Sequence, residues 1–109
     1  MVARPAKKGE YEIVCITAQA AKGWSDALSQ FRNAMADAWD RRTAQPTAVD
    51  GQRVYCLERD LAFGSYAGRD YRRYQYKVSD GARIWYFVDE TDRRVLVELV
   101  ATGHPKATE

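Results

Sequence analysis

The single histidine of this chain stands near its C-terminal end, in a short tail that also carries a lysine. His104 follows Gly103 after an apolar stretch with the pattern of a strand, and Lys106 comes two residues later. Histidine is the side chain whose ordinary pKa allows it to take up or release a proton near neutral pH. A lone histidine at the end of a strand, close to other cations, suggests a site that handles phosphate.

A second group of cations lies on two consecutive predicted strands. Alternation along residues 71–79 separates an apolar face from a polar face that includes Lys77. On the next strand, residues 83–89, Arg83 and Trp85 share one face. If the turn brings Arg83 beside Lys77, the open side of the sheet carries a cationic cluster with the tail at its rim. The residues that we expect to converge there are Arg73, Lys77, Arg83, Trp85, His104 and Lys106.

Such a cluster suits cleavage of RNA without a metal. The ribose 2′-OH can attack the scissile phosphate if a base removes its proton, an acid protonates the leaving 5′-oxygen and cations stabilise the phosphorane. His104 can serve as acid or base, Arg83 can bind phosphate through its planar guanidinium, and Trp85 can stack on a base. The candidate catalytic residues are His104, Arg83 and Lys77, and the candidate RNA-binding residues are Arg72, Arg73, Trp85 and Lys106.

Simpler interpretations fit the same residues. A charged strand face is more often only solvated than catalytic. A lone histidine near a chain end is usually incidental. Composition alone therefore does not establish an enzyme.

The composition is that of a small globular domain. The chain has 109 residues, of which 46% are hydrophobic and 29% charged, enough for one core. Residues 1–9 are expected to form a disordered basic arm without the apolar core of a signal peptide, and residues 10–109 a single domain. No apolar run is long enough to span a membrane, so we expect a cytoplasmic protein. Cys15 and Cys56 are expected to be buried, reduced thiols, and no Cys/His spacing resembles a metal site.

The first part of the chain predicts one strand, over residues 10–16, and two helices. Thr17 can cap a short helix from Ala18 to about Gly23, and Ser25 can cap a second helix that ends at about Arg42. Apolar residues at three- and four-residue steps predict a core-facing side for the second helix. These residues are Leu28, Phe31, Met35, Ala38 and Trp39.

The rest of the chain predicts strands joined by tight turns. The expected strands cover residues 53–58, 61–67, 70–79, 83–89 and 94–102. Tight turns join antiparallel neighbours. We therefore expect an α+β domain in which two N-terminal helices pack on one face of a twisted antiparallel sheet of four to five strands. The strand residues expected in the core are Ile84, Tyr86, Val88, Leu96, Leu99, and Val95 or Val97.

With these features together, the chain resembles the RelE-like branch of the RelE/ParE superfamily of type II toxin–antitoxin toxins. The likeness covers about residues 10–109 and includes the order of strand, two helices and meander. Residues 76–86, YKVSDGARIWY, are similar to the family's basic strand, turn and R-x-x-Y strand. Gly103-His104 resembles the glycine and the basic or histidine residue after the family's last strand.

The resemblance implies the fold of small microbial ribonucleases and a ribosome-dependent mRNA endonuclease that needs neither cofactor nor metal. It also implies that the ribosome, mRNA and a cognate antitoxin are partners, and that no membrane is. By position, Arg83 falls on the family's phosphate-binding arginine and Lys77 on its strand lysine, while several members have a histidine where His104 stands. The chain departs from the pattern at Pro105, where an arginine is common, so Lys106 would have to compensate. It also lacks the terminal tyrosine by which some members orient the base.

The resemblance also leaves open the role of one tyrosine and the activity of the protein. Tyr86 aligns with a family tyrosine, but strand alternation points it towards the core, which indicates a structural role. The superfamily also contains ParE-type inhibitors of DNA gyrase, which need no catalytic residues, and a non-toxic relative would only bind RNA or a partner. A histidine among cations favours the nuclease, and the altered tail keeps the gyrase inhibitor open.

Overall fold

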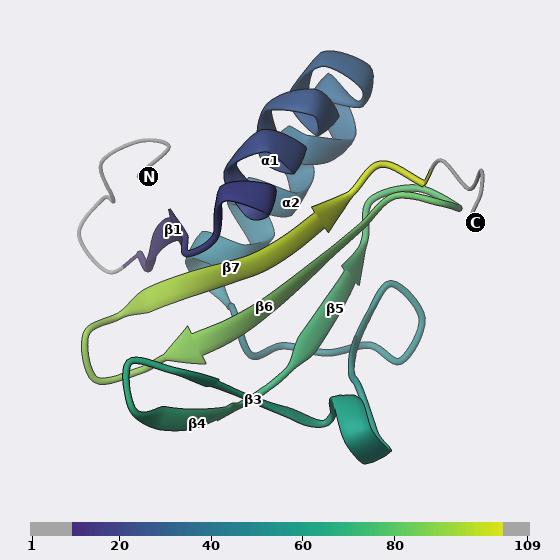
Figure 1. The fold of residues 1–109 in the computed structure, drawn as a ribbon. Helices are drawn as coiled ribbons and strands as arrows, with labels where there is room; N and C mark the ends of the chain where they lie inside the picture. Colours follow the sequence, from purple (N-terminus) through teal and green to yellow (C-terminus); the bar gives the residue numbers. More distant parts are fainter. Residues whose placement is uncertain (1–9, 104–109) are drawn as a thin grey trace.

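The chain folds in the order strand, two helices and a series of strands. The structure is a computed structural model that describes residues 10–103. Its helices lie on one side of the main sheet and a small hairpin lies on the other (Figure 1). The elements are β1 (Glu12–Cys15), α1 (Ala18–Gln30), α2 (Arg32–Ala44), β2 (Val54–Cys56), a 3-10 turn (Arg59–Leu61), β3 (Phe63–Tyr66), β4 (Arg69–Arg72), β5 (Tyr74–Lys77), β6 (Arg83–Asp89) and β7 (Arg94–Ala101).

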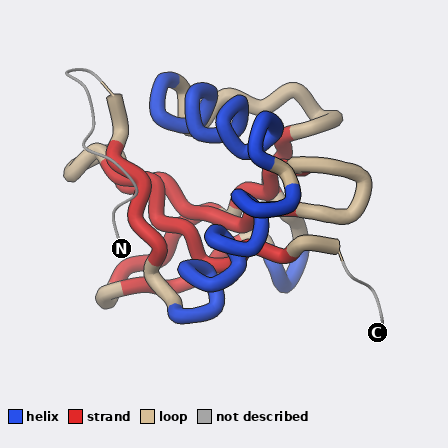
Figure 2. The backbone as a smooth tube through the Cα atoms, turned by 90° about the horizontal axis from the view of Figure 1, so that it is seen from above, coloured by secondary structure: helices blue, strands red, loops and turns tan. Residues whose placement is uncertain are grey.

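The main sheet has five strands in the order β1-β7-β6-β5-β2, and β3 pairs with β4 in a separate two-stranded sheet. The α+β class and the packing of both helices on one face are as predicted, and a view from above shows the helices over the strands (Figure 2). The expectation of a wholly antiparallel sheet is wrong at β1, which runs parallel to β7. Two helices, and no tight turn, separate β1 from the next strand, so the turn argument does not apply to it.

The two helices divide at Phe31, and not near Gly23 as predicted. Thr17 caps α1 as expected, since its hydroxyl accepts a hydrogen bond of 2.9 Å from the Ala20 N–H. The helix continues through Gly23 because the glycine lets α1 approach β7: a Cβ at Gly23 would stand 2.0 Å from the Val100 carbonyl oxygen. The break comes at Phe31, with φ −133° and ψ 53°. No glycine or proline marks it in the sequence.

The core fills the space between the helices and the sheet. It includes Ile13, Trp24, Met35, Ala38, Val54, Tyr76, Ile84, Tyr86, Val95, Val97 and Val100. Leu28, predicted to be in this core, is 42% exposed, because the buried side of α1 is formed instead by Ala20, Gly23, Trp24 and Ala27. Leu96 is buried, but it alternates with Val95 and Val97 and so lies on the opposite face of the sheet.

The β3–β4 hairpin covers part of that opposite face. Its turn is Ala67-Gly68, both with positive φ, as in a type I′ turn. Tyr71 of β4 stacks on Phe87 of β6 with ring centroids 5.5 Å apart. The continuous strand predicted over residues 70–79 is interrupted at Arg73, whose N–H donates to the Ala62 carbonyl and whose carbonyl accepts from the Leu57 N–H. The chain thus passes from the hairpin into the main sheet at this residue.

Three smaller expectations can be compared with the fold. Cys15 and Cys56 are free thiols, with Cys15 buried and Cys56 half-buried. No helix within residues 10–103 is long and apolar enough to cross a membrane. The predicted basic arm, residues 1–9, lies outside the described residues.

Candidate functional site

Lys77 and Arg83 stand directly opposite each other on β5 and β6, which meets the condition set for the predicted cationic cluster. Their neighbours Tyr76 and Ile84 point into the helix-side core, so Lys77 and Arg83 lie on the open face of the sheet. Within residues 10–103 neither side chain forms an ion pair, and Arg83 is exposed. Two uncompensated cations side by side are suited to bind a phosphate.

The turn between these two strands also contacts the end of β7. Ser79 Oγ accepts a hydrogen bond of 3.0 Å from the Ala82 N–H and closes the turn. Gly103, with φ +82°, packs its backbone against Gly81, and a Cβ at Gly103 would stand 2.5 Å from the Gly81 carbonyl carbon. The chain therefore leaves β7 beside the β5–β6 turn (Figure 1). Lys77 and Arg83 stand at the two ends of that turn. The remaining predicted site residues of the tail, His104 and Lys106, lie outside the described residues.

A second row of side chains crosses the open face beside the first. Tyr55, Gln75 and Trp85 are in register on β2, β5 and β6. Trp85 Nε1 donates a hydrogen bond of 2.7 Å to Gln75 Oε1, and Gln75 Nε2 donates to the Tyr55 hydroxyl. Trp85 was predicted for this face, whereas Tyr55 and Gln75 were not recognised as site residues. The tight β5–β6 turn could have placed Gln75 opposite Trp85, but the pairing of β2 with β5 has no comparable sequence signal.

Arg73 also lies on this face, but its guanidinium is already engaged. It forms two hydrogen bonds with the Glu98 carboxylate, of 2.7 and 2.9 Å, and its Nη1 donates to the carbonyls of Leu61 and Phe63. The guanidinium lies over the Trp85 ring, and Arg73 as a whole is only 9% exposed. A carboxylate neutralises its charge, so this geometry does not support the predicted role in binding phosphate.

Arg72 lies apart from the row of Lys77 and Arg83. It pairs with Phe63 across the β3–β4 hairpin, and its guanidinium carbon is 5.4 Å from the centre of that ring. Tyr71 points from the hairpin towards the sheet, so alternation turns Arg72 and Phe63 outward. Phe63 is 60% exposed. The predicted RNA-binding residues Arg72 and Arg73 are therefore not brought together with Lys77 and Arg83.

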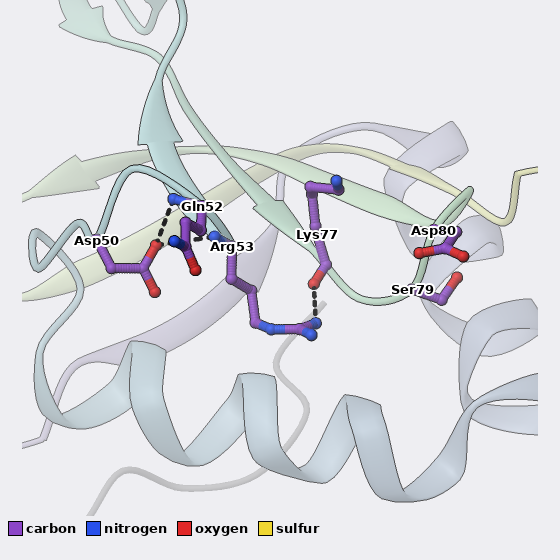
Figure 3. Close-up of a pocket in the computed structure, with 6 residues that line it drawn as sticks. All are labelled: Asp50, Gln52, Arg53, Lys77, Ser79 and Asp80. Carbon is purple, nitrogen blue, oxygen red and sulfur yellow. Dashed lines mark hydrogen bonds between the residues drawn. The ribbon is translucent and has the colours of Figure 1, made fainter.

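A polar pocket opens at the edge of the sheet next to Lys77. It measures about 230 Å³ and is lined by Asp50, Gln52, Arg53, Lys77, Ser79 and Asp80 (Figure 3). The Arg53 guanidinium donates a hydrogen bond of 2.7 Å to the Lys77 carbonyl, while the Lys77 ammonium points away from it. Asp50 accepts hydrogen bonds from the backbone N–H groups of Val54, Gln52 and Arg53, which lower its pKa to about 2. Asp50 is thus a fixed anion that shapes this loop.

Tyr86 is structural, as the sequence predicted. It is 0% exposed and its hydroxyl bonds to Arg42 Nη1 at 2.9 Å and to the Pro46 carbonyl at 3.1 Å. Burial raises its pKa to about 12, although the nearby Arg42 charge acts in the opposite direction. The phenol is neutral at any physiological pH and faces away from Lys77 and Arg83.

The comparisons leave the function to be argued from these residues. No protein-family model matches the chain, and no curated protein matches it. Within residues 10–103, no three side chains of the types that bind metals are grouped closely enough to share an ion. The distinctive feature is the open face, with a cationic row of Lys77 and Arg83 beside a hydrogen-bonded aromatic row.

Proposed function

We propose that this protein is a RelE-like toxin of a type II toxin–antitoxin pair, which cuts mRNA on the ribosome without a metal. The observation that carries the proposal is the juxtaposition of Lys77 and Arg83, free of carboxylate partners within residues 10–103, on the sheet face opposite the helices. The contact of Gly103 with Gly81 supports it, because the chain reaches this end of the sheet one residue before His104.

The proposed reaction is an in-line attack by the ribose 2′-OH on the adjacent phosphate. The 2′-oxygen forms a bond to phosphorus, the bond from phosphorus to the 5′-oxygen breaks, and a 2′,3′-cyclic phosphate and a 5′-hydroxyl result. One proton leaves the 2′-OH and one reaches the 5′-oxygen, and His104 carries out one of these transfers. Arg83 and Lys77 stabilise the negative charge that grows on the phosphorane oxygens.

The proposed partners follow from the same surface. The ribosome and mRNA present phosphates to the cationic row, and the toxin acts in the cytoplasm, where translation takes place. A cognate antitoxin silences the toxin by covering the row with an acidic segment that folds on binding. Arg73 has no direct part in this chemistry, because Glu98 neutralises it.

The test is mRNA cleavage in a purified translation system, read by mapping the 5′ ends of the products. We expect wild-type protein to cut translated messages, and Arg83→Ala, Lys77→Ala and His104→Ala each to lower the rate by about a hundredfold or more. Arg32→Ala and Lys22→Ala are matched controls, since both residues are exposed on the helices. Circular dichroism and thermal unfolding show whether each variant keeps its fold.

Three outcomes would contradict the proposal. Unchanged cleavage by a folded Arg83→Ala variant would show that the cationic row is not the active site. Intact mRNA together with gyrase-dependent DNA breaks would instead support the ParE-type alternative. A wild-type protein that is harmless on expression and cuts no message would support the non-toxic relative.

A further inference from the structure

The row formed by Tyr55, Gln75 and Trp85 is built to present one particular hydrogen-bond donor. The indole N–H of Trp85 can only donate, so the Gln75 amide must turn its oxygen towards Trp85 and its nitrogen towards Tyr55. The Tyr55 oxygen then accepts from Gln75 and keeps its own proton free to donate. Within residues 10–103 no acceptor takes that proton.

The row is supported at its Trp85 end. Arg73, fixed by Glu98, lies with its guanidinium carbon 5.5 Å from the centre of the Trp85 ring. Gln75 is only 9% exposed, so its amide is enclosed between the two aromatic residues. A partly buried chain of hydrogen bonds orients the groups that it joins. The chain ends at Tyr55, which is half-buried and retains access to solvent.

The position of the row relative to Lys77 and Arg83 matches the dimensions of a nucleotide. Gln75 lies two residues before Lys77 on β5, and Trp85 lies two residues after Arg83 on β6. The two rows are therefore about 7 Å apart along the strands. One nucleotide spans such a separation from its phosphate to its base. Single-stranded RNA is recognised by proteins through unstacked bases held by aromatic groups and hydrogen bonds.

We propose that the Tyr55 hydroxyl donates a hydrogen bond to the nucleobase next to the phosphate held by Lys77 and Arg83. Tyr55 is then a specificity residue for single-stranded RNA, and Gln75 and Trp85 are positioning residues that fix its ring. This inference rests on the proposed function, because it takes the cationic row as the phosphate site. It adds a base-reading subsite on β2, one of the two edge strands of the five-stranded sheet.

Binding of RNA that cannot be cleaved tests the subsite apart from catalysis. The probes are four 2′-O-methyl trinucleotides that differ only in the central base, titrated while tryptophan fluorescence is recorded. Trp24 and Trp39 lie on the helix side, and Trp85→Phe identifies the signal that comes from the open face. We expect wild-type protein to bind the four probes unequally, because a donor selects bases that offer an acceptor at the contacted edge.

Tyr55→Phe removes the donor and keeps the ring. We expect it to weaken the best probe by roughly two- to tenfold, as for the loss of one hydrogen bond, and to make the four affinities nearly equal. Gln75→Leu keeps the Tyr55 hydroxyl but frees its orientation, and we expect a reduced base preference. Lys22→Ala is the control and should bind all four probes as the wild type does.

The results separate this inference from the proposed function. A Tyr55→Phe protein with the wild-type order of base preference would overturn it, as would the absence of any Trp85 response to all four probes. Cleavage of mRNA by a protein that reads no base through Tyr55 would leave the nuclease standing and remove the subsite. Selective binding that depends on Tyr55, without cleavage of any message, would keep the subsite and remove the nuclease.

Discussion

Arg73, Lys77 and Arg83 are all basic residues on one face of the sheet, yet their surroundings give them different roles. Arg73 is paired with Glu98 and tied to the backbone of the hairpin, whereas Lys77 and Arg83 have no carboxylate partner within residues 10–103. A phosphate that approached Arg73 would have to displace a partly buried carboxylate. The number of cations on a strand therefore overstates how many can bind an anion.

The raised pKa of the Tyr86 phenol predicts how the stability of the protein depends on pH. Its pKa is about 12 in the fold and about 10 in an unfolded chain, because burial favours the neutral phenol. The stabilisation is complete below pH 10 and is lost as the pH rises from about 10 to about 12. The full loss corresponds to about 2–3 kcal/mol of unfolding free energy.

Urea unfolding of the wild type and Tyr86→Phe between pH 8 and pH 11 measures this effect. The wild type should lose more stability over this interval than the variant, which lacks the titrating group. Tyr86→Phe should also be less stable at pH 8, because Arg42 loses one of its acceptors. Equal pH dependence in the two proteins would show that the phenol titrates normally.

At the scale of the elements, the Arg73–Glu98 pair joins the β3–β4 hairpin to the main sheet. Glu98 is on β7, Arg73 lies between β4 and β5, and the carbonyls of Leu61 and Phe63 belong to the approach to the hairpin and its first strand. The hairpin is also held by the backbone hydrogen bonds at Arg73 and by the stack of Tyr71 on Phe87.

We expect Glu98→Ala to lower the free energy of unfolding by about 2–4 kcal/mol, because it leaves the Arg73 charge without its partner in a poorly solvated position. The matched control is Asp26→Ala, which breaks the exposed pair of Lys22 and Asp26 on α1 and should cost less than about 1 kcal/mol. Denaturant unfolding measures both changes. Similar small losses in the two variants would mean that the hairpin is attached by its other contacts alone.

The elements also show how far the sequence could predict this structure. Turn residues and alternation located the strands and put Lys77 and Arg83 on one face. The pairing of the two residues was stated only as a condition on the turn geometry, and the structure meets it. The helix break at Phe31 was not predicted, because no glycine or proline marks it and Gly23, which suggested an earlier break, serves the contact of α1 with β7.

Contacts between distant segments could not be predicted from the sequence pattern. The pair of Arg73 with Glu98 joins residues 25 positions apart, and the bond of Gln75 to Tyr55 depends on which strand lies beside β5. Periodicity tells which face a residue occupies but not which partner it meets there. For this reason the sequence predicted the candidate site only as a set of cations. It did not predict that Glu98 would neutralise Arg73, or that Tyr55 would lie in a row beside the cations.

At the scale of the whole molecule, the sheet separates two kinds of surface. One face buries the apolar core under α1 and α2, and the hairpin lies on the other side (Figure 1). The cationic and aromatic rows lie on that second face. The close contact of Gly81 with Gly103 brings the end of the last strand to the cationic end of that open face. A net charge of +2 is thus less informative than its distribution, because Lys77 and Arg83 lie side by side on the open face without a carboxylate partner in residues 10–103.

This distribution predicts how the affinity for RNA depends on salt. Each phosphate contact releases counterions, so the logarithm of the affinity should fall linearly with the logarithm of the salt concentration. We expect Arg83→Ala and Lys77→Ala each to reduce the magnitude of that slope by roughly one, as for the loss of one phosphate contact. Arg32→Ala and Lys22→Ala on the helix side should leave the slope as in the wild type, and Arg73→Met, if the variant folds, should do the same.

Titration of a fluorescent single-stranded RNA between low and moderate salt measures all five variants. Equal reductions in the helix-side variants would show that RNA binds through the overall charge of the protein, and the open face would lose its claim to be the functional surface.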